Sequence, residues 1–259
     1  MGKRKAMTSE QARKVRQAGH DDAKEFAHLI GLSDDYQNDP QAKKDVIDLD
    51  GDAHSVKSGK KKWQIFLYSL KRFDTDIIFK RLNGLGELFL EIIKVFPEQR
   101  SEYLENKNYY KSLLSQKMIN LKDKLSFRET LEAFLDKSFF NAGEVQYLTI
   151  KQNDIFHVFH RDDVLSVLTE EISVENSRGN QKVIFKVNNT NPKTAKRFPK
   201  ITIGEIEMRN DSNVHYREIK FWMRKGLTFG ILTNKITKIK NPKPKLKIFG
   251  KAIKKFKKY

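Results

Sequence analysis

The sequence of 259 residues contains no cysteine. This absence excludes disulfide bonds, cysteine-based zinc sites and cysteine nucleophiles, and it fits a reducing cytoplasm. The sequence also lacks a continuous apolar run of the roughly 18 residues that a membrane-spanning helix needs. No apolar segment follows the basic start at residues 1–5, so we expect neither a signal peptide nor a transmembrane helix.

Two common site types are missing as well. His157 and His160 have no further ligands at a zinc-binding spacing, and residues 59–62 lack the spacing of a phosphate-binding loop. We therefore expect no transition-metal site and no ATP-driven activity.

Acidic residues are scarce relative to basic ones. The chain has 51 Lys and Arg against 33 Asp and Glu, which gives a net charge of +18. A protein this basic usually meets a polyanion, most often nucleic acid. The 38% hydrophobic content, with 18 Phe, is sufficient for a folded core.

The basic charge is densest near the C-terminus, where residues 235–259 contain eleven lysines and no acidic residue. We predict a basic tail over 241–259 that contacts phosphates. A solubilising tail and a membrane-surface helix are alternatives. The apolar residues of this segment leave open that it packs on the core instead.

Apolar spacing predicts the main elements. We expect helices at 9–31, 62–72, 75–95, 101–140 and 161–168, a hairpin at 43–59, and strands at 145–150, 155–159, 181–187, 201–209 and 214–222. This mixture indicates an α/β fold, with one domain over 1–240 and a helical insertion at about 75–140.

The hairpin at 43–59 is the most informative segment. Asp50-Gly51 is a strong turn signal, and folding there brings Asp45 close to Lys57. A carboxylate and a lysine placed in this way can hold Mg²⁺ and orient a water against a phosphodiester. The alternative is a surface hairpin with solvated charges.

A leading helix with Glu25, a strand opening at Lys44-Asp45-Val46, a strand ending at Ser55-Val56-Lys57, and Gln64 shortly after follow one another in the first 70 residues. This order resembles the PD-(D/E)xK nuclease superfamily, in particular type II restriction endonucleases. The resemblance implies a central mixed β-sheet flanked by helices, Mg²⁺ as cofactor and double-stranded DNA as substrate.

The resemblance also implies site roles. Asp45 corresponds to the acid that binds Mg²⁺, and Lys57 to the lysine that positions or deprotonates the attacking water. The chain departs from the pattern at Ser55, where the family has its second acid. We predict that Glu25 supplies that carboxylate, with Asp48 and Asp52 as local alternatives.

Two further sets of residues extend the predicted site. Gln64 and Tyr68 resemble a Gln-x-x-x-Tyr element that follows the lysine in some nuclease branches, although ordinary packing explains them equally well. Predicted DNA contacts, with turn residues as the alternative, are Lys60, Lys61, Lys62, Arg178, Asn210, Asn213, His215 and Arg217. A weaker second acid-and-base string is Glu205-Ile206-Glu207-Met208-Arg209.

The sequence therefore predicts a Mg²⁺-dependent, site-specific DNA endonuclease of a restriction–modification system, acting in a prokaryotic cytoplasm, with a homodimer left open. A non-catalytic nucleic-acid-binding protein is the first alternative, and a structural partner protein is the second.

Overall fold

A computed structural model describes residues 8–37, 43–59, 61–190 and 197–258. These residues form two compact units, each assembled from separate segments. Unit 1 consists of the described residues within 1–60, 139–164 and 233–259. Unit 2 consists of those within 61–138 and 165–232. The sequence predicted one domain with a tail, because composition shows no linker at the points where the chain passes from one unit to the other.

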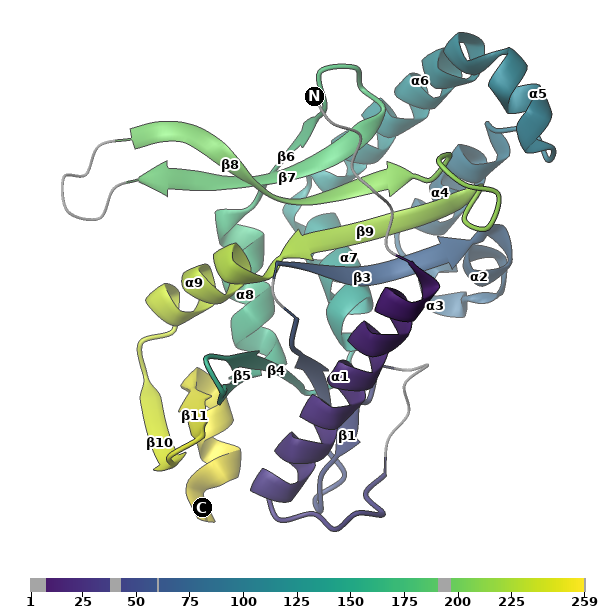
Figure 1. The fold of residues 1–259 in the computed structure, drawn as a ribbon. Helices are drawn as coiled ribbons and strands as arrows, with labels where there is room; N and C mark the ends of the chain where they lie inside the picture. Colours follow the sequence, from purple (N-terminus) through teal and green to yellow (C-terminus); the bar gives the residue numbers. More distant parts are fainter. Residues whose placement is uncertain (1–7, 38–42, 60, 191–196, 259) are drawn as a thin grey trace. The chain divides into compact units, whose positions relative to one another are not determined.

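Unit 1 is built on a six-stranded sheet in the order β1-β2-β4-β5-β11-β10 (Figure 1). Its elements are α1 (Ser9–Leu29), β1 (Val46–Ile47), β2 (Ala53–Lys57), β4 (Tyr147–Gln152), β5 (Ile155–His160), β10 (Ile239–Lys243), β11 (Leu246–Phe249) and the 3₁₀ helix η1 (Gly250–Lys258). The pairs β2–β4 and β5–β11 are parallel and the others antiparallel. The sheet is therefore mixed, as expected.

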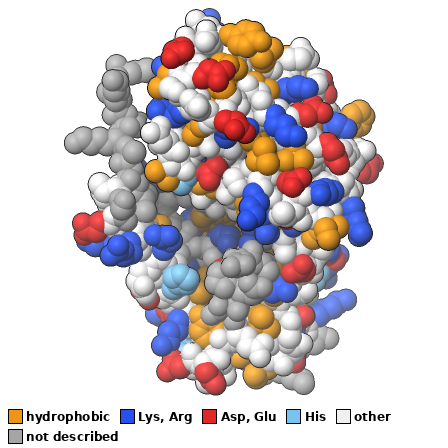
Figure 2. Space-filling view, turned by 90° about the vertical axis from the view of Figure 1, so that its right-hand side faces the viewer, with side chains coloured by type: hydrophobic (Ala, Val, Ile, Leu, Met, Phe, Trp, Pro, Cys, Tyr) orange, Lys and Arg blue, Asp and Glu red, His pale blue; other side chains and the backbone are white. Residues whose placement is uncertain are grey.

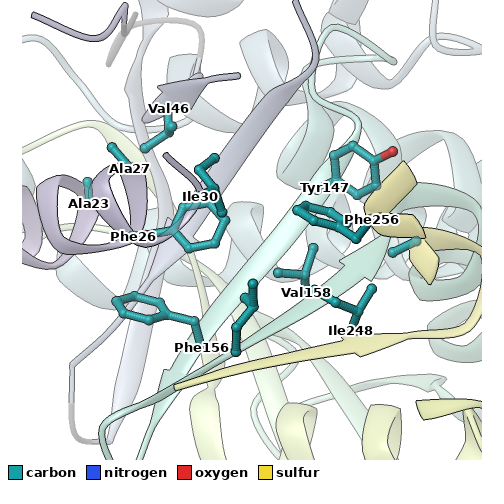
Figure 3. Close-up of a cluster of buried hydrophobic side chains, with 12 residues drawn as sticks. Ala23, Phe26, Ala27, Ile30, Val46, Tyr147, Phe156, Val158, Ile248 and Phe256 are labelled. Carbon is teal, nitrogen blue, oxygen red and sulfur yellow. The ribbon is translucent and has the colours of Figure 1, made fainter. Parts of the chain in front are cut away.

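One face of this sheet is covered by α1 and η1. Thr8 caps α1 with a reciprocal capping box, and four apolar residues follow at helical spacing on its inner side. Figure 3 shows them meeting side chains from the strands and from η1. The cluster consists of Ala23, Phe26, Ala27, Ile30, Val46, Tyr147, Phe156, Val158, Leu246, Ile248, Ala252 and Phe256. Burying a side chain such as Phe26 completely contributes roughly 1.5–3 kcal/mol.

The predicted C-terminal tail is part of this core. Leu246, Ile248 and Phe256 are at most 1% exposed, and β11 pairs with β5 along its whole length. The separate basic tail over 241–259 is therefore wrong for the described residues 241–258. Lysines alternate here with apolar residues because the segment is a strand and a helix with one buried side each.

Unit 2 has a five-stranded antiparallel sheet in the order β3-β9-β8-β7-β6. The strands are β3 (Lys62–Ser69), β6 (Ser173–Asn176), β7 (Lys182–Thr190), β8 (Arg197–Met208) and β9 (Glu218–Arg224). The helices are α2 (Leu70–Thr75), α3 (Ile77–Lys80), α4 (Leu85–Lys94), α5 (Arg100–Glu105) and α6 (Lys107–Leu125). Three more helices cross the boundary with unit 1: α7 (Arg128–Phe140), α8 (Arg161–Glu171) and α9 (Lys225–Lys235).

The core of unit 2 is rich in phenylalanine. Rings from β3 and β9 contact rings from α2, α3 and α7, for example Phe66 with Phe73 and Phe134 with Phe221. This cluster accounts for much of the high Phe content. The helices predicted as an insertion at about 75–140 therefore pack on the sheet of unit 2 and form one α/β unit with it.

The helix predicted at 62–72 is wrong, because residues 62–69 form β3. A bulge shifts the pairing with β9 between Gln64 and Phe66. As a result Trp63, Ile65 and Phe66 are all buried, and the apolar residues lose the alternation that identifies a strand. The helices at 9–31 and 161–168 and the hairpins at 43–59 and 145–159 are confirmed.

Candidate functional site

The β1–β2 hairpin places the two main candidate residues on one face of the strand pair. Val46 pairs with His54, so Asp45, one residue earlier, lies opposite Ser55. Side chains alternate along a strand, so Ser55 and Lys57 point away from the face that α1 covers. The expected proximity of Asp45 and Lys57 is therefore present in the hairpin.

Asp45 is held by three neighbouring groups. Its Oδ2 accepts a hydrogen bond of 2.7 Å from the backbone N–H of Val56 and a longer one of 3.4 Å from the Ser55 hydroxyl. The Lys57 ammonium lies 3.6 Å from the same oxygen. Within the described residues, the other oxygen, Oδ1, makes no hydrogen bond or ion pair. The carboxylate is thus oriented by the hairpin and keeps one oxygen available.

A hollow of about 170 Å³ adjoins Asp45 at this edge of unit 1. Its lining comes from α1, from the loop after α1 and from the hairpin: Arg16, Gly19, His20, Ala23, Tyr36, Asp45 and Val56. The sequence motifs missed Arg16 and His20, because only the packing of α1 on the hairpin brings them beside the acid.

The opposite face of the same hairpin carries a second charged cluster. His54 is fully buried, and its Nε2 lies 3.2 Å from Asp48 Oδ2 while its Nδ1 lies 3.3 Å from Thr149 Oγ1. The neutral ring that donates from Nε2 and accepts at Nδ1 satisfies both contacts. Lys255 from η1 binds three carboxylates, those of Asp48, Asp50 and Asp52, at 3.3, 2.8 and 2.6 Å.

These contacts set the charge states of the second cluster. Burial lowers the pKa of His54, so the ring is neutral in the fold. Burial opposes the charge of Asp48, but hydrogen bonds from His54 and from the Asp52 amide, together with Lys255, hold the pKa of Asp48 below its ordinary value. Asp48 and Asp52, the alternative metal ligands, are therefore engaged in holding η1 against the hairpin.

Glu25 lies in a third cluster, at the α1 face of β4. Its oxygens pair with Lys151, and with Lys245 at 3.3 Å. Lys151 also binds Asp22 at 2.8 Å. Among the described residues, Glu25 shares no contact partner with Asp45. The fold thus brings Asp45, Ser55 and Lys57 together and leaves Glu25 in a separate ion-pair group.

Gln64 and Tyr68 lie on β3 in unit 2. Gln64 is exposed and pairs with Trp222 across the sheet. Tyr68 stacks on Phe66 with ring centroids 4.6 Å apart and is half-buried. Their placement on a helical face was wrong, and Tyr68 has the packing role that the alternative interpretation gave it.

The predicted DNA contacts are distributed over unit 2. Lys60 lies outside the described residues, and Lys61 is exposed beside it. The ammonium of Lys62 lies 3.2 Å from the centre of the Trp222 ring. Arg178 is exposed in the turn between β6 and β7. Figure 2 shows Lys and Arg side chains interspersed with Asp and Glu on the face in view, rather than gathered in a single stripe.

The other four predicted contacts lie in the loop between β8 and β9. Asn210 donates 2.8 Å to the Tyr103 hydroxyl, and Asn213 accepts 3.0 Å from Arg100. His215 Nδ1 lies 2.8 Å from Glu218 Oε2, and Arg217 approaches Glu98 at 3.8 Å and has a positive φ of 61°. This loop is fastened to α5 and to the segment before it by its own polar groups.

The weaker candidate string at Glu205 and Glu207 forms a ladder of ion pairs. Lys182 on β7 binds Glu207 at 2.6 Å and Glu205 at 3.3 Å, and Lys220 on β9 lies 3.5 Å from Glu207. Such cross-strand pairs stabilise a solvent-facing sheet surface.

The donor set around Asp45 meets the minimum for Mg²⁺. This ion is often bound by one or two carboxylates together with water and substrate phosphates. Asp45 supplies one carboxylate whose Oδ1 has no partner among the described residues, and Ser55 supplies a neutral hydroxyl. The residues that the structure describes contain no group of three or more His, Cys, Asp or Glu suited to a metal, and no helix among them could cross a membrane.

The chain was compared with protein-family models, with curated proteins and with solved structures, and no match was found in any of the three.

Proposed function

We propose that the protein is a Mg²⁺-dependent DNA endonuclease of the PD-(D/E)xK type, with a restriction–modification role. The observation that carries the proposal is the Lys57–Asp45 pair, 3.6 Å apart, on the same face of the β1–β2 hairpin. The sequence spacing predicted this pair, and a carboxylate beside a lysine can hold Mg²⁺ and orient a water against a phosphodiester. The net charge of +18 supports a polyanionic substrate.

Each residue of the pair has a distinct task. Asp45, held at Oδ2 by the Val56 amide, would hold the metal through Oδ1. A bound Mg²⁺ supplies Lewis acidity and a more acidic water at the scissile phosphate. Lys57 orients the attacking water and offsets the negative charge that develops on the phosphate oxygens. Ser55 places a hydroxyl, not a second negative charge, beside Asp45.

A non-catalytic nucleic-acid-binding protein is the second candidate. Two observations favour it: Ser55 replaces the family's second acid, and Glu25 pairs with Lys151 and Lys245. Both candidates require binding to DNA, so cleavage separates them.

The test is incubation of the wild-type protein with plasmid DNA and Mg²⁺. We expect discrete fragments, and we expect Asp45→Asn and Lys57→Ala to lose cleavage by about a hundredfold or more while binding persists. Lys44→Ala is a matched control, because Lys44 lies on the same hairpin but pairs with Glu144 at 3.1 Å. A mobility shift without cutting by the wild type would establish the non-catalytic alternative.

A further inference from the structure

The hollow beside Asp45 is lined by two nitrogen-bearing side chains of α1 that contact no carboxylate of the described residues. Arg16 and His20 line it from successive turns of α1. Within the described part of the chain, neither has an ion pair or hydrogen bond. They lie one turn apart, and both are exposed to solvent.

Most other cations around this site are paired. Lys57 approaches Asp45, Lys44 approaches Glu144, and Lys151 binds Asp22 and Glu25. Lys255 meets three carboxylates, and Lys151 also reaches a third, that of Asp154. Arg16 therefore differs from these neighbours in lining a hollow without a counter-ion among the residues that the structure describes.

We infer that Arg16 and His20 form a subsite for a phosphate group of the DNA backbone, adjacent to the phosphate that is cut. This inference rests on the proposed nuclease function and adds to it a substrate contact made by α1. Both residues bind phosphate oxygens as hydrogen-bond donors, and an arginine can do so bidentately.

The charges and the volume of the hollow agree with this ligand. Asp45 repels a phosphate, but Lys57 lies 3.6 Å from its Oδ2 and offsets that charge. With the charge of Asp45 offset by Lys57, the charge of Arg16 gives the surroundings of the hollow a net positive charge. At about 30 Å³ for each water, a hollow of about 170 Å³ accommodates a phosphate group with part of its hydration shell.

The test is a chemical double-mutant cycle on binding. It uses a short duplex that carries a mapped cleavage site or, if the plasmid is not cut, any duplex that the protein binds, with Ca²⁺ replacing Mg²⁺ to prevent hydrolysis. Single phosphates are replaced in turn by neutral methylphosphonates. At the contacted phosphate, we expect replacement to weaken wild-type binding roughly tenfold and binding by Arg16→Ala less than about twofold.

Controls separate this contact from general electrostatics. Arg13→Ala removes the same charge from the same exposed helix, but Arg13 does not line the hollow, so the effect of the methylphosphonate should stay at the wild-type value. Arg16→Lys should restore part of the coupling. Alanine is the best helix former, so Arg16→Ala is compatible with folding of α1.

The outcomes distinguish the subsite from the proposed function. Additive effects at every phosphate, or equal coupling for Arg13→Ala and Arg16→Ala, would overturn the subsite even if the wild type cuts DNA. Coupling at Arg16 without cleavage would keep the subsite and remove the nuclease activity. A wild type that binds no duplex would overturn both.

Discussion

The two faces of the β1–β2 hairpin carry similar side chains in different states. On one face, Asp45 has one lysine at 3.6 Å and an Oδ1 that no described residue contacts. On the other, Lys255 is surrounded by Asp48, Asp50 and Asp52, and Asp48 also meets His54. Each carboxylate of the second cluster has a partner within the protein, whereas the first keeps an acceptor that no described residue contacts.

This difference distinguishes acidic residues that the sequence alone presents as equal candidates for a metal ligand. Asp45, Asp48 and Asp52 lie within one short hairpin, and each was a candidate metal ligand. The number of hydrogen-bond and ion-pair partners that each carboxylate has among the described residues distinguishes the three. A ligand-binding carboxylate needs a free oxygen, whereas a structural one is fully paired in the fold.

Removing the lysine on each face is the most direct test of whether the two faces have separate roles in cleavage and in stability. Lys57→Ala should reduce DNA cleavage by about a hundredfold or more and change the free energy of unfolding by less than about 1 kcal/mol, since the pair is partly exposed. Lys255→Ala should lower stability by about 1–3 kcal/mol because three carboxylates lose their common cation. Its cleavage activity should persist well below its melting temperature.

Plasmid cleavage and urea unfolding, measured on both variants, check this pair of expectations. Lys251→Ala serves as the matched control for Lys255→Ala, because Lys251 is also in η1 but its ammonium pairs with one described carboxylate, Asp162, at 3.2 Å. If both lysine variants lost activity and stability together, the two faces would not have separate roles.

Much of unit 1 could be predicted from local signals. Apolar spacing predicted α1, turn signals at Asp50-Gly51 and Asn153-Asp154 predicted two hairpins, and the first hairpin brings Asp45 and Lys57 together. The α/β class followed from the alternation of these elements. Local propensities decide such features without help from the rest of the chain.

The features that could not be predicted depend on contacts distant in sequence. Strand β3 looks helical until its bulge and its pairing with β9 are known. The lysine-rich end looks like an arm until β11 pairs with β5, and Lys255 meets Asp52 some two hundred residues earlier in the chain. The same holds for Glu25, whose partners lie on β4 and near β11.

Lowering the pH should reduce the free energy of unfolding through the second cluster in two stages. Burial lowers the pKa of His54 in the folded protein. Below about pH 6.5 the histidine of the unfolded chain therefore binds a proton while the buried ring stays neutral. Stability should then fall with pH, by at most about 1.4 kcal/mol per pH unit for this group. The pKa of Asp48 is also lowered, so its contribution, present above its ordinary value of 3.8, is lost as the pH falls below that value.

Urea unfolding between pH 4 and pH 8 measures the first stage. His54→Gln can keep polar contacts to Asp48 and Thr149 without titrating, so it should flatten the slope between pH 6.5 and pH 5. An unchanged slope in this variant would mean that His54 does not set the acid sensitivity.

The smallest expected effect concerns Glu25, and it decides which cluster this acid belongs to. The sequence predicted that Glu25 replaces the acid missing at Ser55, which requires Glu25→Gln to lose cleavage by orders of magnitude. The contacts with Lys151 and Lys245 favour a different result. We expect Glu25→Gln to lower stability by about 1 kcal/mol or less and to leave cleavage within about threefold of wild type, because the amide keeps a hydrogen bond to Lys151 and Asp22 still neutralises that lysine. Asp22→Asn, which removes another of the carboxylates that pair with Lys151, is the matched control and should behave alike. A loss of cleavage in Glu25→Gln with full activity in Asp22→Asn would instead return Glu25 to the metal site, through a movement of α1 toward the hairpin when DNA binds.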